Sequence, residues 1–177
     1  MLDTIVTSKT RIKLLIKFFL NSGTSSYLRD LETEFGDSTN SIRLELNRFE
    51  EAGMLVSRVE GNKKLFRANT AHPLFKDIHN ILLTITGIDQ IIESVLNRLG
   101  GLEEAWLVGD FAAGRNSKVI DLVLVGIDIN VDNLIDYISK AESMISRKIR
   151  YLILTPAESE IIEKHYPVRL KLMGRGD

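Results

Sequence analysis

The residues between Val108 and Gly126, VGDFAAGRNSKVIDLVLVG, place two carboxylates in a setting typical of phosphate chemistry. The pattern predicts a strand, a glycine turn with Asp110, a short helix, and a second strand with Asp121. Acids at positions i and i+2 of a strand point to one face, so a pair of them can share the Mg²⁺ ions that assist phosphoryl transfer. Here Val119, which cannot bind a metal, stands two residues before Asp121. The stretch therefore has the layout of such a site but an incomplete set of acids.

A second group of side chains has the chemistry of DNA recognition. Arginine pairs with guanine, asparagine pairs with adenine, and small hydroxyls reach phosphates or base edges. The candidate contacts are Ser38, Thr39, Asn40, Ser41, Arg43 and Asn47 on one expected helix, and Lys63, Lys64 and Arg67 beyond it. The acids Glu45, Glu50 and Glu51 would repel phosphate, so the contact is expected in the first half of that helix. The alternative is that these are ordinary solvated residues of a surface helix.

Three short helices and a hairpin are expected to hold the DNA-facing side chains. Each helix begins after a serine and ends near a glycine, in the pairs Ser8 and Gly23, Ser26 and Gly36, and Ser38 and Gly53. The apolar period then changes to two over residues 54–69, with a glycine turn, which predicts a β-hairpin. Three helices and a hairpin make a winged helix-turn-helix, assigned to residues 1–71, whose second motif helix enters the major groove.

The remaining elements follow after Pro73. Residues 72–100 predict a connecting helix, or two abutting helices near Gly87, with an apolar stripe from Ile78 to Leu99. We expect this stripe to pack across a two-fold axis and form a homodimer; the alternative is that it packs only within the chain. Residues 101–177 alternate strands and helices, which predicts an α/β domain with a small mixed sheet. The whole chain is therefore expected to be of the α+β class.

The segment LNRFEEAGMLVSRVEGNKKLFRAN, residues 46–69, resembles a known family. Its helix end, Glu-Glu-Ala-Gly followed by apolar residues and a basic wing, is similar to the winged helix of ArsR-like bacterial transcriptional regulators. The resemblance covers roughly residues 8–75 and implies binding to double-stranded operator DNA, usually as a dimer. The ArsR-like metal sensors use Cys and His ligands, and this chain has no cysteine. Metal sensing is therefore not carried over.

The stretch described first is similar to the nucleotidyltransferase superfamily, especially its minimal bacterial members. The resemblance extends over about residues 101–160 and rests on the turn at Gly109 and Asp110, the glycine-arginine pair that ends the short helix, and Asp121 on the following strand. It implies a site for Mg²⁺ and a nucleoside triphosphate. An ArsR-like winged helix joined to such a domain is a known architecture, so each resemblance supports the other.

The chain departs from the nucleotidyltransferase pattern at three places. Asp110 replaces the turn serine, Val119 replaces the first acid of the strand, and Arg150 stands where a third acid is expected. A carboxylate at the turn would repel a triphosphate unless a cation intervened. Asp110 can instead cap the short helix, and Asp121 can pair with Arg115 or Arg150. We therefore expect a degenerate motif, formed by Gly109, Asp110, Val119 and Asp121, with no catalytic residue, no metal and no cofactor.

Composition excludes several other classes of protein. The apolar fraction of 44% and the charged fraction of 27% are ordinary for a globular protein, and the absence of cysteine excludes disulfides. No apolar run approaches the ~20 residues that span a bilayer, and the start lacks a signal-peptide layout. We expect a cytoplasmic protein with no membrane partner. Residues 1–75 carry two excess positive charges and residues 76–177 three excess negative charges, which favours DNA facing the first half.

These observations lead to two hypotheses. The main prediction is a sequence-specific DNA-binding transcriptional regulator that acts as a dimer and is not an enzyme. Its inactive nucleotidyltransferase-like domain would sense a small ligand or bind a protein partner. The alternative is an active, divergent nucleotidyltransferase of the antitoxin type that carries a winged-helix domain. The acids near Asp121 discriminate between the two.

Overall fold

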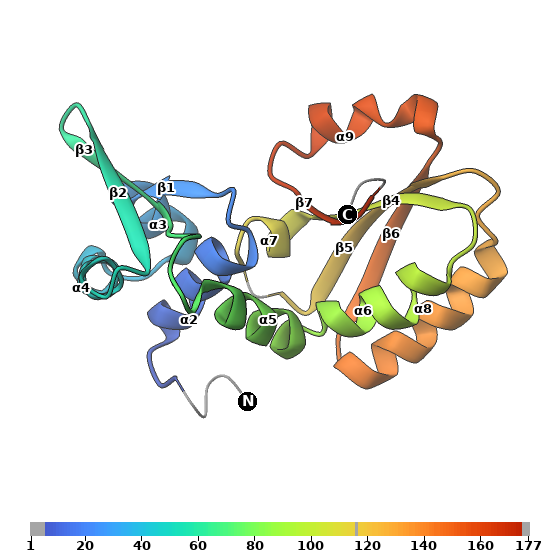
Figure 1. Cartoon of the computed structure of the whole chain (residues 1–177), viewed down its shortest axis with the longest axis horizontal. Coiled ribbons are helices and arrows are strands. Elements are labelled where there is room, and N and C mark those ends of the chain that lie inside the picture. Colours follow the sequence, from blue (N-terminus) through green and yellow to red (C-terminus); the bar gives the residue numbers. More distant parts are fainter. Residues whose placement is uncertain (1–5, 116, 175–177) are drawn as a thin grey trace. The chain divides into compact units, whose positions relative to one another are not determined.

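The computed structural model describes residues 6–115 and 117–174 and has a mixed α+β architecture with two small sheets (Figure 1). The chain divides into two compact units, Met1–Ile85 and Thr86–Asp177. The predicted α+β class is confirmed. Within the described residues, no helix is both long enough and apolar enough to span a membrane.

Helices dominate the first unit. Those that precede the hairpin are α2 (Lys9–Leu15), the π-helical segment η1 (Ile16–Leu20), α3 (Leu28–Phe35) and α4 (Thr39–Glu51). Ser8 and Ser38 cap α2 and α4 as predicted, because each hydroxyl accepts a hydrogen bond from a backbone N–H of the first turn. Ile42, Leu46 and Phe49 recur at helical spacing along one face of α4, and all three are buried. Their burial leaves the opposite side of α4 facing solvent.

The hairpin predicted after α4 is present as β2 (Leu55–Glu60) and β3 (Lys63–Ala68), with the turn at Gly61. A third strand, β1 (Ser25–Tyr27), pairs antiparallel with β3 to give the order β1-β3-β2. β1 was not predicted, and the prediction that Ser26 caps a helix is wrong. Ser26 is buried opposite Phe66 in the sheet, and Tyr27 is the residue that precedes α3.

The predicted connecting helix is broken at Gly87. α5 (Phe75–Thr86) ends there, and α6 (Ile88–Ser94) and the short η2 (Leu96–Arg98) follow. Gly87 has φ +82°, and a Cβ at this position would lie 2.7 Å from Ile145, so both the backbone and the packing require glycine.

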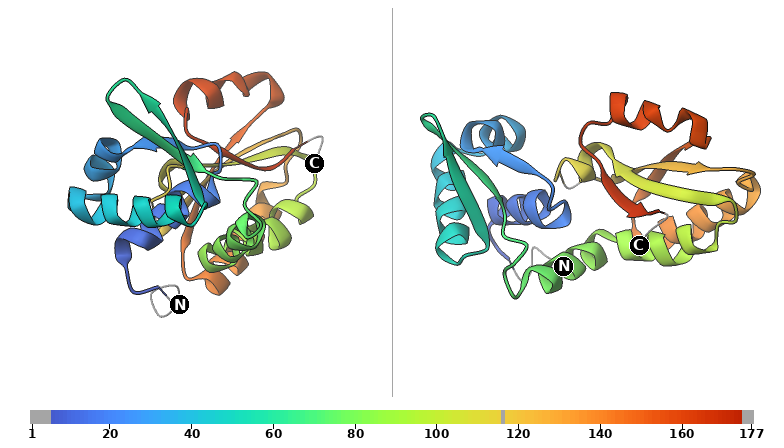
Figure 2. Two further views of the ribbon diagram at one scale, coloured as in Figure 1. Left: turned by 60° about the vertical axis from the view of Figure 1, so that its left-hand side comes forward. Right: turned by 45° about the horizontal axis from the view of Figure 1, so that its top comes forward.

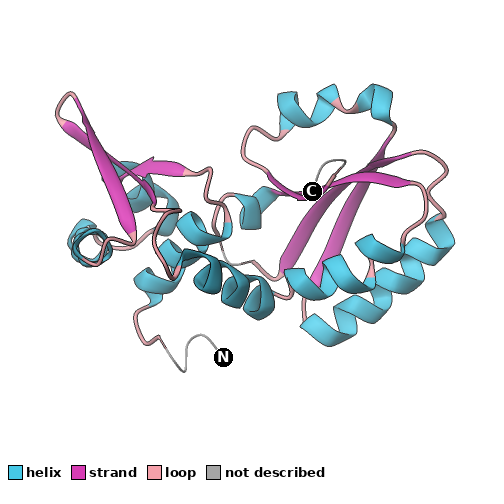
Figure 3. Cartoon of the chain, in the orientation of Figure 1, coloured by secondary structure: helices cyan, strands magenta, loops and turns pink. Residues whose placement is uncertain are grey.

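A four-stranded mixed sheet forms the centre of the second unit. Its strands are β4 (Leu102–Val108), β5 (Val119–Gly126), β6 (Lys148–Leu154) and β7 (Leu170–Met173), in the order β6-β5-β4-β7. Only β5 and β6 are parallel. The predicted mixed sheet is therefore present, although β7 was not anticipated (Figure 3).

Helices cover both faces of this sheet (Figures 1 and 2). On one face α6 packs against α8 (Val131–Ile145). On the other lie η3 (Pro156–Glu158) and α9 (Glu160–His165), where Ile162 packs with Val108, Val123 and Leu154. The short α7 (Gly109–Ala112) follows β4 directly. Because side chains alternate along a strand, Asp121 lies on the same face as Val123, the α9 face.

Candidate functional site

The first candidate site is a groove of about 560 Å³ between α4 and the β2–β3 hairpin. Of the nine residues predicted as DNA contacts, some line this groove and others do not. Those that line the groove are Thr39, Arg43, Asn47, Lys63 and Lys64. Those that do not are Ser38, Asn40, Ser41 and Arg67, and of these Arg67 lines a smaller hollow on the hairpin. The groove thus gathers one of the two arginines, one of the two asparagines, both lysines and the threonine of the predicted set.

The start of α4 is fixed by Asp37. Its carboxylate accepts hydrogen bonds from the Thr10 hydroxyl and the Lys13 ammonium, each at 2.8 Å. Burial acts to raise the pKa of Asp37, but the hydrogen bonds from Lys13 and Thr10 outweigh it and lower the pKa. The Ser41 hydroxyl lies 3.2 Å from that of Thr10, and the Thr39 hydroxyl donates to Glu32 at 2.5 Å. These two candidates therefore contribute to positioning α4.

Two of the three acids of α4 that were expected to repel phosphate, Glu45 and Glu50, are paired with cations. Glu45 is buried, accepting hydrogen bonds from Arg11 at 2.8 and 3.2 Å and from Arg48 at 3.1 Å. Burial acts to raise the pKa of Glu45, but the arginines lower it overall. The Lys64 ammonium donates to Glu50 at 2.6 Å, which lowers the pKa of the Glu50 carboxyl. The charges of Glu45 and Glu50 are thus balanced within the unit.

Three predicted candidates on α4 remain exposed: Asn40, Arg43 and Asn47. Their side chains form no hydrogen bond or ion pair with any residue in the described ranges. The Lys63 ammonium lies over the Tyr27 ring, 5.5 Å from its centre, in a cation–π contact. These side chains, together with the exposed Arg67, are available to an outside ligand.

Six residues that line the groove were not predicted. They are Tyr27, Leu28, Arg29, Glu32, Asn62 and Phe66. The sequence placed both Tyr27 and Arg29 in the second helix; this is right for Arg29, which lies on α3, whereas Tyr27 lies in β1. Pairing of β1 with the hairpin strand β3 brings this segment to the groove, and no local pattern in the sequence marks that pairing.

The second candidate site lies where β4 ends, α7 begins and β5 passes alongside. The Arg150 Nε donates to the Asp121 Oδ1 at 2.6 Å, and the two residues are neighbours in the parallel pairing of β5 and β6. Gly109 has φ +66°, and a Cβ there would lie 2.7 Å from the Asp121 Oδ2. The turn backbone therefore packs directly on this carboxylate, and only glycine allows that approach.

Asp110 was expected to cap the short helix, and this is wrong. It lies inside α7, whose N-cap is Val108, and its carboxylate accepts from the Arg115 Nε and Nη2 at 2.9 and 2.7 Å. The pairing of Asp121 with Arg150 is confirmed. The hydrogen bond from Arg150 to Asp121 raises the pKa of Arg150, and the nearby charges of Asp121 and Asp110 add to that effect. Each acid at this corner thus has its own arginine.

The donor set does not fit a divalent-cation site. The Asp121 Oδ1 accepts a hydrogen bond from Arg150, its Oδ2 lies close to Gly109, and the Val119 side chain is apolar. Among the described residues, no group of three or more His, Asp or Glu side chains is placed to hold a metal ion. Magnesium prefers several hard oxygen ligands, so we derive no chemical step through a metal here.

Comparisons with known proteins extend these observations. No protein-family model matches the chain, and no curated protein matches it. Solved structures similar to it include AF1382 from Archaeoglobus fulgidus, with 20% identity, coverage of 52% of this chain and 98% of that one, and a TM-score of 0.38. The MNT antitoxin complex with the tri-AMPylated HEPN toxin of Shewanella oneidensis has 16% identity, coverage of 50% and 70%, and a TM-score of 0.38. A provisionally assigned nucleotidyltransferase from Sulfolobus solfataricus has 20% identity, coverage of 55% and 86%, and a TM-score of 0.37.

These comparisons correct one expectation. The sequence analysis predicted that the chain is not an enzyme, whereas the similar structures include a protein assigned as a nucleotidyltransferase and a complex that contains the MNT antitoxin. The similarity extends over about half of this chain. The prediction of a non-enzyme is therefore withdrawn.

Proposed function

We propose that the second unit is a divergent nucleotidyltransferase-type domain, and that the chain as a whole is of the antitoxin type, with a winged-helix domain in its first unit. One observation carries the proposal: the Gly109 turn packs on the Asp121 carboxylate where β4, α7 and β5 meet. A glycine turn that follows one strand and touches an acid on the next is the layout on which the nucleotidyltransferase resemblance rests.

The residues present at this corner favour binding of phosphate groups. Phosphoryl transfer depends mainly on positioning the phosphates and on stabilising the charge that develops on them. Arg150 and Arg115 carry that positive charge here, and their side chains are 72% and 45% exposed. Both are anchored by a carboxylate, which limits the conformational entropy lost when a ligand binds.

A thermal-shift series with each nucleoside triphosphate, followed by a transfer assay with α-labelled nucleotide, tests this function. The expected result is stabilisation by at least one nucleotide and label on an acceptor protein. Asp121→Ala should reduce both, while Asp132→Ala, on the exposed start of α8, should leave both unchanged. No stabilisation and no transfer with any nucleotide would refute the proposal.

We further propose that the first unit is a winged helix that binds double-stranded DNA, because the groove between α4 and the hairpin combines Arg43, Asn47 and Lys63. These side chains suit base edges and phosphates. The chain would then act as a sequence-specific regulator through this unit, as a dimer on a palindromic site.

A gel shift on the DNA upstream of the protein's own gene tests DNA binding. Arg43→Ala should weaken specific binding by roughly 1–3 kcal/mol if the guanidinium reads a base. The matched control is Arg98→Ala, an exposed arginine of the second unit. Equal affinity of the Arg43 variant and the control would exclude Arg43 as a base contact.

A further inference from the structure

We propose that Arg150, held in place by Asp121, binds the phosphates of a nucleoside triphosphate in the second unit without a divalent cation. This inference rests on the proposed nucleotidyltransferase-type function and specifies how its ligand is held. It follows from the observation that the acids of this corner do not fit the Mg²⁺ site that the nucleotidyltransferase resemblance implies.

The first argument is the geometry of the guanidinium. Arg150 uses only its Nε to bind Asp121, at 2.6 Å. Its two terminal amino groups make no hydrogen bond with any residue in the described part of the chain, and the side chain is 72% exposed. A guanidinium fixed through Nε presents its remaining N–H groups as a planar fork, which matches two oxygens of a phosphate.

The second argument is the charge of the corner. Asp110 and Asp121 alone would repel a triphosphate. Arg115 lies 2.7 Å from Asp110 and Arg150 lies 2.6 Å from Asp121, so each negative charge is offset within hydrogen-bond distance. The negative charge of Asp110 also acts on Arg150 and raises the pKa of its guanidinium. The arginines thus perform the neutralising role that a bound cation has in a metal-dependent site.

The third argument is that a cation would have to displace existing contacts. The Asp121 side chain is only 19% exposed; its Oδ1 accepts a hydrogen bond from Arg150, and its Oδ2 lies so close to Gly109 that a Cβ there would be 2.7 Å away. Val119, the neighbour of Asp121 on the same face of β5, offers no oxygen from its side chain. A metal would gain one carboxylate and lose the Arg150 ion pair, whereas a phosphate keeps that pair.

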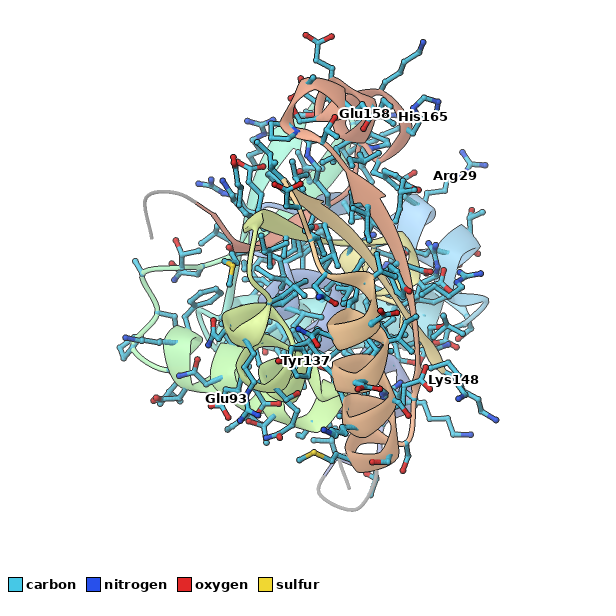
Figure 4. The ribbon with its side chains drawn as sticks, turned by 90° about the vertical axis from the view of Figure 1, so that its right-hand side faces the viewer. Arg29, Glu93, Tyr137, Lys148, Glu158 and His165 are labelled. Carbon is cyan, nitrogen blue, oxygen red and sulfur yellow. The ribbon has the colours of Figure 1, made fainter. Side chains whose placement is uncertain are left out.

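Isothermal titration of the full chain with ATP and with inorganic tripolyphosphate, each in EDTA and in Mg²⁺, tests the inference. Wild-type protein should bind ATP in EDTA about as tightly as in Mg²⁺. Arg150→Met should weaken metal-free binding roughly 10- to 100-fold, the usual effect of losing a hydrogen-bonded charge. Lys148→Met is the matched control on the same strand, because Lys148 is exposed and paired with Glu142 at 2.7 Å (Figure 4). It should bind like wild type.

Asp121→Asn separates the two kinds of site by the sign of its effect. Asparagine keeps an oxygen for the Arg150 Nε and removes one negative charge, so metal-free binding should be retained or become about threefold tighter. A metal site would instead lose affinity, because it would lose its ligand. Thermal unfolding of every variant, including Arg150→Lys, confirms that the second unit is folded.

The outcomes distinguish this inference from the proposed function. ATP binding that requires Mg²⁺ and is abolished by Asp121→Asn would overturn the inference and leave the proposed function in place. Binding of tripolyphosphate as tight as that of ATP would show that only the phosphates are recognised, which supports the role of Arg150. Absence of ATP binding in both buffers would overturn the inference and the nucleotide site together.

Discussion

The two lysines at the start of β3 should contribute differently to DNA binding. Lys64 donates to Glu50 at 2.6 Å, and Glu50 also accepts from the Ser57 hydroxyl at 2.6 Å, so Lys64 joins the hairpin to the end of α4. Lys63 has no ion pair among the described residues and lies over the ring of Tyr27. We predict that Lys63 contacts a phosphate and that Lys64 positions the hairpin.

The magnitude follows from counterion release. Each phosphate neutralised by a lysine contributes about 0.9 to the slope of log affinity against log salt, which is roughly a 3.5-fold loss of affinity between ~50 and ~200 mM salt. Lys63→Met should therefore reduce the slope by about 0.9. Lys64→Met should leave the slope unchanged, because the Lys64 charge is already neutralised by Glu50. Glu50→Gln should raise the slope by up to about 0.9, because it releases Lys64 to the DNA.

Fluorescence anisotropy with one labelled duplex at four salt concentrations measures these slopes. Circular dichroism shows whether each variant keeps its fold, since Lys64→Met removes a hairpin contact. Equal decreases in slope for Lys63→Met and Lys64→Met would refute the reasoning, and so would a Glu50→Gln slope identical to that of wild type. A slope near zero for wild type would instead refute DNA binding by this unit.

Three further predictions concern stability and assembly. Because the pKa of Asp37 is lowered in the folded chain, its ionised carboxylate stabilises the fold at pH values above the ordinary carboxyl pKa, and this stability is lost as pH falls through the lowered pKa. In a plot of melting temperature against pH, Asp37→Asn should therefore show a smaller decrease at acid pH than wild type. Gly109→Ala should destabilise the second unit by more than the ~1–3 kcal/mol of backbone strain, because the new Cβ would also clash with Asp121. Gly36→Ala is the control, because Gly36 also has φ +66° but open space around it, so it should show the strain alone. Chemical denaturation measures both. Ile81, 54% exposed on α5, should lie in the predicted dimer contact, so Ile81→Asp should convert a dimer to a monomer in light scattering; a monomeric wild type would contradict the dimer.

Local patterns were sufficient to predict much of the secondary structure. Ser8 and Ser38 were recognised as caps because a hydroxyl before an amphipathic segment satisfies free backbone N–H groups. The hairpin followed from period-two alternation around Gly61, and the buried face of α4 followed from helical spacing. These features depend on residues within a few positions of each other.

The features that were missed depend on contacts between distant segments. β1 has three residues and exists because it pairs with β3, and β7 has four and pairs with β4. At the candidate sites, Arg150 was predicted only as one of two possible partners of Asp121, the other being Arg115. Its contact with Asp121 requires β6 to lie beside β5 in parallel register, which a sequence pattern does not specify. Similarly, the pairing of Glu50 with Lys64 spans 14 residues and depends on how the hairpin folds back on α4.

The place of β7 at the edge of the sheet has a consequence for how the protein is made. β4 is synthesised well before β7, yet β7 supplies one of its two hydrogen-bonding neighbours. Until Leu170–Met173 have left the ribosome, one edge of β4 is open to pair with other chains. A nascent or truncated chain that ends before β7 should therefore be prone to aggregation, even though β4, β5 and β6 have all been made.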